Sequence, residues 1–326
     1  MYEKKKLAIG LVSVLITLNL ILIFVIGLCF TREEIEKEEE PTFAQRFKDD
    51  YSIYSLELPD SLCFAGEEVP MDYFDVLESL DRELLVNTYW QSNTILLIKR
   101  ANRYFPVIEK ILEENNIPED FKYIPLIESE LTHSISPAGA VGFWQFLQGT
   151  AREYGLEVNY QVDERYNIEK STEAACSFLN SAYERFGSWT LAAAAFNFGR
   201  SAMLRQLDRQ EVDSYYNLLL NEETARYIFR ILAMKLIMND PEEYGFNIRD
   251  EDLYYPVPYN KVEVDTTVED FAKFAGQFST NYKMLKILNP WLRQEYLRNP
   301  RGKTYQIKIP EDGARYYQKH EVNRKQ

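Results

Sequence analysis

Apolar residues spaced three or four apart dominate the middle of the chain, and this spacing predicts helices. Between residues 72 and 115 the pattern indicates a helical N-terminal extension, which we place at residues 59–115. No strand alternation interrupts residues 116–240, so we expect an all-helical domain there. Within that domain the periodic segments predict helices over residues 172–186, 189–197 and 224–238.

The pattern changes after residue 253. Short alternating apolar segments predict strands, and two periodic segments between them predict helices. The expected strands are residues 254–258, 262–264 and 305–310, and the expected helices are residues 267–278 and 282–288. Residues 253–310 are therefore predicted to form a small α+β module, followed by a frayed tail over residues 311–326.

The first 32 residues have the pattern of a membrane anchor. Three lysines, Lys4 to Lys6, precede an uncharged apolar run over residues 7–30 that is long enough to cross a bilayer. No Ala-x-Ala site closes this run, so we expect residues 1–32 to stay attached, with the rest of the chain outside the cytoplasm. Lipoprotein processing at Cys29 is the alternative. Residues 33–58 are acidic and are predicted to be a solvated linker.

Composition excludes several classes of function. The formal charge of −14 disfavours nucleic acid as a partner, because phosphates need basic side chains. A polysaccharide would be held by stacking and hydrogen bonds, and 14% of the residues are aromatic. The two histidines, His133 and His320, are too few for a histidine-based metal site or a Ser-His-Asp triad. We expect no metal and no cofactor.

The cysteines do not form a metal-binding or redox pair, because none of the three lies in a CxxC motif. Cys176 lies in an apolar stretch and is interpreted as a small buried residue. A disulfide between Cys63 and Cys176 is the alternative.

Glu128 is an unusual charge at the end of an apolar run. If Pro118 opens a helix, Ile124, Glu128 and Leu131 fall on one side of it. Glu130 lies roughly 200° around that helix and cannot pair with Glu128. A carboxyl among apolar neighbours resists ionisation, which is the property of a general acid. The alternative is a glutamate on the helix surface.

Eight segments extend this observation. They are Glu128 with Ser129, GFWQF (142–146), GTAREYG (149–155), DER (163–165), STEAA (171–175), FGSW (186–189), AAAAFNFG (192–199) and ETARY (223–227). In this order they resemble the catalytic domain of the soluble lytic transglycosylase superfamily, and most of all its membrane-bound murein branch. The resemblance implies a lysozyme-like all-helical catalytic domain over residues 116–240, and peptidoglycan glycan strands as the partner.

The resemblance also implies roles for individual residues. Glu128 would be the catalytic acid and base, with Ser129 supporting it. Ser136 would orient the N-acetyl group of the sugar, and Gly142 would let the backbone turn close to the substrate. Gln145 would be a hydrogen-bonding residue of the cleft. Trp144 is either a core residue or a platform for sugar.

The remaining candidates lie on the later helices. Asn197 matches an asparagine of the family, while Phe196 stands where the family has tyrosine, so stacking is kept and a hydroxyl is lost. Tyr227 either supplies a phenol beside Glu128 or is a core tyrosine.

Glu128 is the one carboxyl assigned to catalysis. The resemblance therefore implies cleavage between N-acetylmuramic acid and N-acetylglucosamine without water, leaving a 1,6-anhydro end. One alternative is hydrolysis of the same bond, with Asp163 or Glu164 as the base. A second alternative is a non-catalytic scaffold that binds the cell wall.

Residues 253–310 are similar to a LysM module, although Val264 stands where glycine is usual before the Asp-Thr turn, and the 291–302 loop is long. This module would either bind N-acetylglucosamine chains or brace the catalytic domain.

Overall fold

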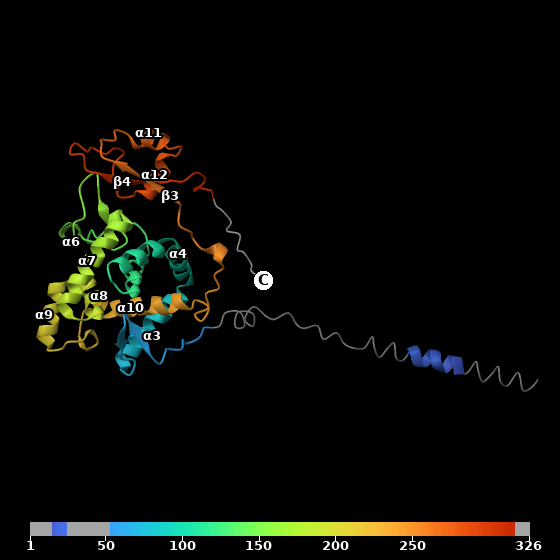
Figure 1. Ribbon diagram of the computed structural model, residues 1–326. Helices are drawn as coiled ribbons and strands as arrows, with labels where there is room; N and C mark the ends of the chain where they lie inside the picture. Colours follow the sequence, from blue (N-terminus) through green and yellow to red (C-terminus); the bar gives the residue numbers. More distant parts are fainter. Residues whose placement is uncertain (1–14, 25–52, 317–326) are drawn as a thin grey trace, which may run out of the picture. The chain divides into compact units, whose positions relative to one another are not determined.

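The computed structural model describes residues 15–24 and 53–316, and the chain divides into one unit over residues 1–55 and a second over residues 56–326 (Figure 1). Residues 15–24 are helical. Within the described ranges, no helix combines the length and hydrophobicity needed to cross a membrane. Most of the expected anchor, Cys29, most of the acidic linker and residues 317–326 of the tail lie outside the described residues.

The second unit begins with a small hairpin that the apolar pattern did not predict. Strand β1 (Leu62–Phe64) pairs antiparallel with β2 (Glu67–Val69) through a turn at Ala65 and Gly66. The Glu67 carboxylate accepts a hydrogen bond from the Thr190 backbone amide at 2.9 Å, near the N-terminus of a later helix. A negative charge is favoured there because the helix dipole is positive at that end.

Two long helices follow and confirm the predicted helical extension. They are α3 (Phe74–Tyr89) and α4 (Gln91–Glu114), joined at Trp90. Helix α3 packs against the last helix of the domain, and α4 packs against α7, so the extension is part of the same body as the helices after it.

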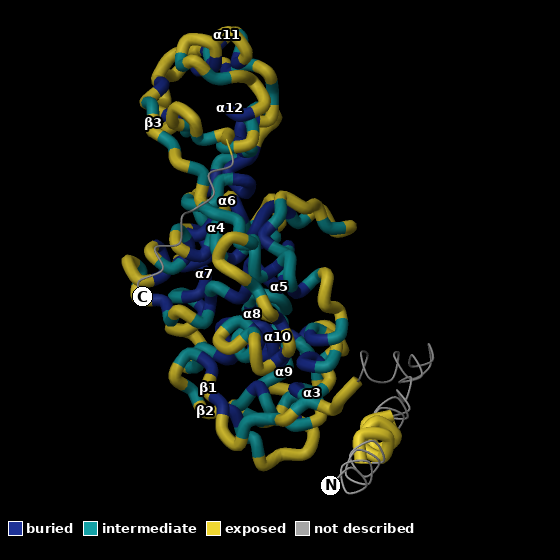
Figure 2. The backbone as a smooth tube through the Cα atoms, turned by 90° about the vertical axis from the view of Figure 1, so that its right-hand side faces the viewer, coloured by how far each residue is buried: buried dark blue, intermediate teal, exposed yellow. Residues whose placement is uncertain are grey.

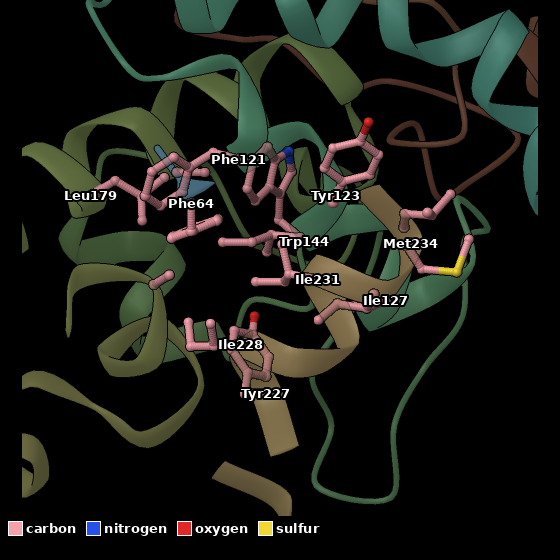
Figure 3. Close-up of a cluster of buried hydrophobic side chains, with 14 of the residues drawn as sticks. Phe64, Phe121, Tyr123, Ile127, Trp144, Leu179, Tyr227, Ile228, Ile231 and Met234 are labelled. Carbon is pink, nitrogen blue, oxygen red and sulfur yellow. The ribbon is translucent and has the colours of Figure 1, made fainter. Parts of the chain in front are cut away.

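The central domain is all helical, as predicted. Its elements are η1 (Glu119–Lys122), α5 (Tyr123–Ser129), α6 (Gln148–Glu153), η2 (Glu164–Tyr166), α7 (Ile168–Phe186), α8 (Trp189–Phe198), α9 (Arg200–Gln210), η3 (Tyr215–Asn217) and α10 (Glu222–Asn239). Helix α8 is buried through Ala192 to Ala195, which lets α7, α9 and α10 pack closely around it (Figure 2). Figure 3 shows Trp144, Tyr227, Ile228 and Ile231 in one buried cluster.

The C-terminal module has the expected β-α-α-β order. After a short turn, η4 (Asp250–Asp252), strand β3 (Tyr259–Val264) pairs antiparallel with β4 (Tyr305–Pro310), and α11 (Phe271–Gly276) and α12 (Tyr282–Leu288) lie between them in sequence. The strand expected at 254–258 is wrong. The backbone of that segment bonds to α4 instead, with the Tyr254 amide donating to the Lys99 carbonyl at 3.2 Å.

The module is joined to the helical domain by backbone bonds and a shared core. The Asp163 amide donates to the Trp291 carbonyl at 2.9 Å, and the Arg293 amide donates to the Gln161 carbonyl at 2.8 Å. Val162 and Tyr166 belong to the module's own hydrophobic core. Lys308 adds an ion pair with Glu169 at 2.7 Å. These contacts fix the module to the helical domain, and whether it binds N-acetylglucosamine chains or braces the catalytic domain stays a prediction.

Candidate active site

Helix α5 presents Glu128 at the edge of the core. Ser129 and every residue from Tyr123 to Ile127 are buried, whereas Glu128 is only partly exposed. The two residues that follow the helix, Glu130 and Leu131, have φ of 54° and 53°, in the left-handed region that ends a helix. The chain therefore turns away directly after the carboxyl.

Tyr227 of α10 holds this carboxyl in place. Its hydroxyl donates to Glu128 Oε1 at 2.7 Å, and the tyrosine is fully buried. Burial raises the pKa of Glu128, and the nearby Glu223 carboxylate adds to that rise, while the Tyr227 hydrogen bond and the charge of Arg230 oppose it. The net effect is a carboxyl that keeps its proton to higher pH than a solvent-exposed glutamate.

Two residues of this site were missed from the sequence, Glu223 and Arg230. With Tyr227 they occupy one face of α10 at spacings of four and three. Arg230 Nη2 donates to the Ile127 carbonyl at 2.6 Å, which ties α10 to the turn of α5 that carries Glu128. Glu223 lies four residues before Tyr227 in the ETARY segment, and Arg230 lies three residues after it. This helical spacing around Tyr227 was the signal in the sequence that could have identified both residues.

Asn197 joins the end of α8 to the start of α10. Its Nδ2 donates to Glu223 Oε1 at 3.1 Å, and its Oδ1 accepts from the Thr224 hydroxyl at 2.9 Å. Through Glu223 the asparagine is linked to the surroundings of Glu128.

Phe196 lies in an aromatic cluster with Trp144, Phe146 and Phe178, at centroid distances of 5.8, 5.5 and 5.1 Å. It is half-buried, and its ring stabilises the packing of α8 against the 142–146 turn and α7.

The 142–146 turn is bound to α5 through Ser129. The Ser129 hydroxyl is buried and donates to the Phe143 carbonyl at 2.9 Å, so it positions the turn behind Glu128. Gln145 Nε2 donates to the Gly142 carbonyl at 2.7 Å and lies 3.2 Å from the Ser134 carbonyl. Its amide nitrogen thus closes the turn upon itself.

Gly142 is required by packing within the chain, and its expected role in letting the backbone turn close to the substrate stays a prediction. It has φ of +79°, and a Cβ there would lie 2.0 Å from the Arg165 carbonyl oxygen. The close approach is to another part of this chain, the 163–166 segment.

The alternative that Trp144 is a platform for sugar is wrong. Its exposed fraction is 0%, and its Nε1 donates to the Thr172 hydroxyl at 2.9 Å, so it is a core residue.

Ser136 is half-buried, and its hydroxyl accepts from the Ala140 amide at 3.0 Å within the 136–140 loop. Its expected role toward an N-acetyl group stays a prediction.

The carboxylates considered as a hydrolytic base are engaged elsewhere. Asp163 Oδ2 pairs with Arg165 Nη2 at 2.8 Å, and both side chains are buried. Glu164 Oε2 accepts from the Glu157 amide at 2.7 Å.

Among the described residues, no group of three or more histidine, cysteine or carboxylate side chains could hold a metal ion. The alternative of a Cys63 to Cys176 disulfide is wrong, because both thiols are free. Cys176 is buried, which raises the pKa of its thiol to about 12.

An all-helical, lysozyme-like domain with one partly buried carboxyl at a helix end is the arrangement expected of a domain that acts on glycans. Residues 105–219 match the family described as "Transglycosylase SLT domain", and residues 260–313 match "Soluble lytic transglycosylase C-terminal LysM-like domain". The chain therefore carries the SLT domain and the LysM-like domain of the soluble lytic transglycosylases.

Two curated proteins are similar to this chain. The chain is 27% identical over 239 residues to "Membrane-bound lytic murein transglycosylase D" of Escherichia coli strain K12, covering 71% of this chain and 51% of that protein. It is 34% identical over 110 residues to a "Putative tributyltin chloride resistance protein" of Alteromonas sp. strain M-1, covering 33% of this chain and 53% of that protein. The chain thus spans about half the length of these relatives.

Proposed function

We propose that this chain is a peptidoglycan lytic transglycosylase, which cleaves the β-1,4 bond between N-acetylmuramic acid and N-acetylglucosamine and leaves a 1,6-anhydro end. The observation that carries the proposal is the Glu128 carboxyl, whose pKa is raised by burial and which is held by Tyr227. The SLT match over residues 105–219 and the name of the E. coli relative support it.

Glu128 would act twice in this mechanism. In its protonated form it donates to the glycosidic oxygen as the bond from that oxygen to C1 breaks, and the 2-acetamido group stabilises the sugar cation. The resulting carboxylate then takes the proton of the muramic 6-hydroxyl, whose oxygen bonds to C1. Holding that hydroxyl beside C1 replaces water by a nucleophile of high effective concentration.

The neighbours of Glu128 suit both steps. Tyr227 donates to Oε1, which leaves Oε2 to meet the substrate. Burial favours the acid before cleavage, and the Tyr227 hydroxyl and Arg230 stabilise the carboxylate that forms after it.

Hydrolysis of the same bond is the second candidate, and one observation favours it. Glu223 is a second carboxylate close enough to affect the pKa of Glu128, so it could act as the base that activates water. Asp163 and Glu164 are less suited to this role, because Asp163 pairs with Arg165 and Glu164 accepts from the Glu157 amide.

The products decide between the two reactions. We expect muropeptides released from purified sacculi to carry anhydro ends, each one water lighter in mass than a reducing end. A digest that contains reducing ends alone would overturn the transglycosylase proposal and favour Glu223 as a base.

The Tyr227 hydrogen bond should set the alkaline limit of activity. The protonated carboxyl is the active form, so the rate falls as pH rises through the raised pKa of Glu128. Tyr227→Phe removes a donor that stabilises the carboxylate, which raises this pKa further. A hydrogen bond to a charged group contributes about 1.5–3 kcal/mol, so the alkaline limb of the pH–rate profile should move up by about one to two pH units.

Tyr183→Phe is the matched control, because this tyrosine is 37% exposed and stacks on Trp189. Its pH profile should equal that of the native chain. An alkaline limb that stays in place in Tyr227→Phe, or that moves down, would refute the assigned role of the hydrogen bond.

Attachment to a membrane through residues 1–32 is part of the proposal. The three lysines before an apolar run of 24 residues and the "Membrane-bound" name of the relative support it. The catalytic domain would then face the cell envelope, and lipidation of Cys29 is the other means of attachment. Cell fractionation of the full chain and of a chain without residues 1–32 tests it, since loss of the segment should release the protein.

A further inference from the structure

A groove lies beside Glu128, between the N-terminal extension and the catalytic helices. Its volume is about 630 Å³, within the range of roughly 300–1,000 Å³ that is typical of ligand sites. Helices α3, α4, α5 and α10 line it. Ile127, which directly precedes Glu128, and Glu130, which lies two residues after it, are among its lining residues, and so is Trp90 at the junction of α3 and α4.

Trp90 is held rigidly by its backbone while its ring faces solvent. Its amide donates to the Val86 carbonyl at 3.1 Å, and its carbonyl accepts from the Asn93 amide at 3.0 Å. The residue is nevertheless 56% exposed, whereas Trp144 and Trp291 are buried and Trp189 stacks on Tyr183. A large aromatic ring exposed on a fixed helix junction is suited to stacking on a ligand.

The polar residues of the groove suit an uncharged ligand. The side chains of Asn87, Asn93 and Asn221 bring amide groups to it. Asn87 Nδ2 donates to the Glu83 carbonyl and Asn221 Oδ1 accepts from the Thr224 amide, so each of these two side chains keeps its other amide atom for a ligand. The buried Glu83 carboxylate fixes Arg226 by accepting from its Nε at 2.6 Å and its Nη2 at 3.2 Å.

The charge of the lining is negative overall. Four carboxylates line the groove against two guanidinium groups, so an anionic ligand such as a free peptide carboxylate is disfavoured. The carboxylates are those of Glu83, Glu130, Glu222 and Glu223, and the guanidinium groups are those of Arg226 and Arg230.

Glu128 does not itself line the groove, but two side chains connect the groove with the surroundings of this carboxyl. Arg230 and Glu223 line the groove, and the same two side chains affect the pKa of Glu128. Arg230 also donates to the Ile127 carbonyl. A glycan strand that lies over Glu128 can therefore continue along this face of α10 toward Trp90.

We propose that this groove is a subsite for uncharged N-acetylated amino sugars of the glycan strand, remote from the cleaved bond, with Trp90 as the stacking platform. The proposal rests on the proposed function for the identity of the strand. It assigns a substrate contact to the N-terminal extension.

Binding is measured on the Glu128→Gln chain, titrated with a β-1,4-linked tetramer of N-acetylglucosamine by calorimetry and by tryptophan fluorescence. We expect saturable binding with a change in emission, because Trp90 is the most exposed of the four tryptophans. Adding Trp90→Ala should weaken the affinity by about tenfold, and Trp90→Tyr, which keeps a ring, should restore most of it.

Phe74→Ala, also on the Glu128→Gln chain, is the matched control. Phe74 is 74% exposed at the other end of the 16-residue helix α3, roughly 24 Å from Trp90, and it does not line the groove. Its affinity should equal that of the Glu128→Gln chain. Equal affinity with and without the Trp90 ring, or no saturable binding in any of these chains, would overturn the proposal.

Turnover separates this inference from the proposed function. In the chain that retains Glu128, Trp90→Ala should lower kcat/KM on long strands by about tenfold and leave that of the shortest cleaved oligosaccharide unchanged. If the native chain cleaves both lengths and Trp90→Ala does so equally well, the subsite is refuted and the function stands. If the native chain cleaves nothing while binding still depends on Trp90, the function is refuted and the subsite stands.

Discussion

Replacing Glu128 by glutamine should reduce cleavage of glycan strands by roughly a thousandfold or more, while the chain stays folded and still binds the strand. One general acid or base contributes about 10²–10⁴ to a rate, and here the same side chain would serve both steps. Glutamine has nearly the same shape, and its amide oxygen can still accept the hydrogen bond that Tyr227 donates to Glu128 Oε1. The loss would therefore be chemical rather than structural.

The same substitution should stabilise the fold at high pH. Because the folded-state pKa of Glu128 is raised, its carboxyl contributes full stability below the unfolded pKa of about 4.3 and loses it as pH rises through the folded pKa. The free energy of unfolding of Glu128→Gln should thus exceed that of the native chain at pH 8, and the difference should shrink toward pH 4. Denaturant unfolding at the two pH values measures this.

Glu173→Gln controls for the loss of a carboxylate. This side chain is exposed on α7 and forms a surface ion pair with Lys170, so activity should stay near native and stability should change by less than about 0.5 kcal/mol. Near-native cleavage by Glu128→Gln would remove the basis of the mechanism, since another group would then have to move the proton.

Replacing Gly142 by alanine should have the largest effect on stability. The new Cβ would lie 2.0 Å from the Arg165 carbonyl oxygen, and the residue would keep a φ of +79°. A left-handed conformation costs about 1–2 kcal/mol and overpacking about 1–3 kcal/mol, so the free energy of unfolding should fall by about 3 kcal/mol. Activity should fall as well, because Ser129 binds this turn behind Glu128.

Gly149→Ala is the control for Gly142→Ala. Gly149 lies in α6 with no atom within 4 Å of a new Cβ, so alanine there should be neutral or slightly stabilising. Denaturant unfolding of both variants measures the contrast. Equal unfolding free energies would show that the 142–146 turn and the 163–166 segment can separate without cost, contrary to the packing described above.

The helices that position the site were predictable because each has a buried stripe at helical spacing. Helix α7 begins at Ile168, before the expected 172, because Asn167 caps it by accepting from the Lys170 amide. Helix α9 was missed because it is mostly polar and only Met203 is buried. The strands β1 and β2, at three residues each, are too short for alternation to be detected.

The site itself was predictable in part. An apolar run ending in Glu128 indicated a carboxyl with a raised pKa, and the structure brings Tyr227 to it from α10. The buried Trp144 donates its hydrogen bond to Thr172, and glycine is required at residue 142 because the Arg165 carbonyl leaves no space for a Cβ. Both partners lie more than twenty residues away in sequence. Such contacts follow from tertiary packing, which residue spacing alone does not reveal.

Digestion of sacculi in water enriched in oxygen-18 tests the central claim most directly. If Glu128 delivers the proton and the muramic 6-hydroxyl closes the ring, no solvent oxygen enters the product, and the new ends should be anhydro sugars without label. New reducing ends that carry oxygen-18 in proportion to the cleaved bonds would contradict the account, because water would then be the nucleophile.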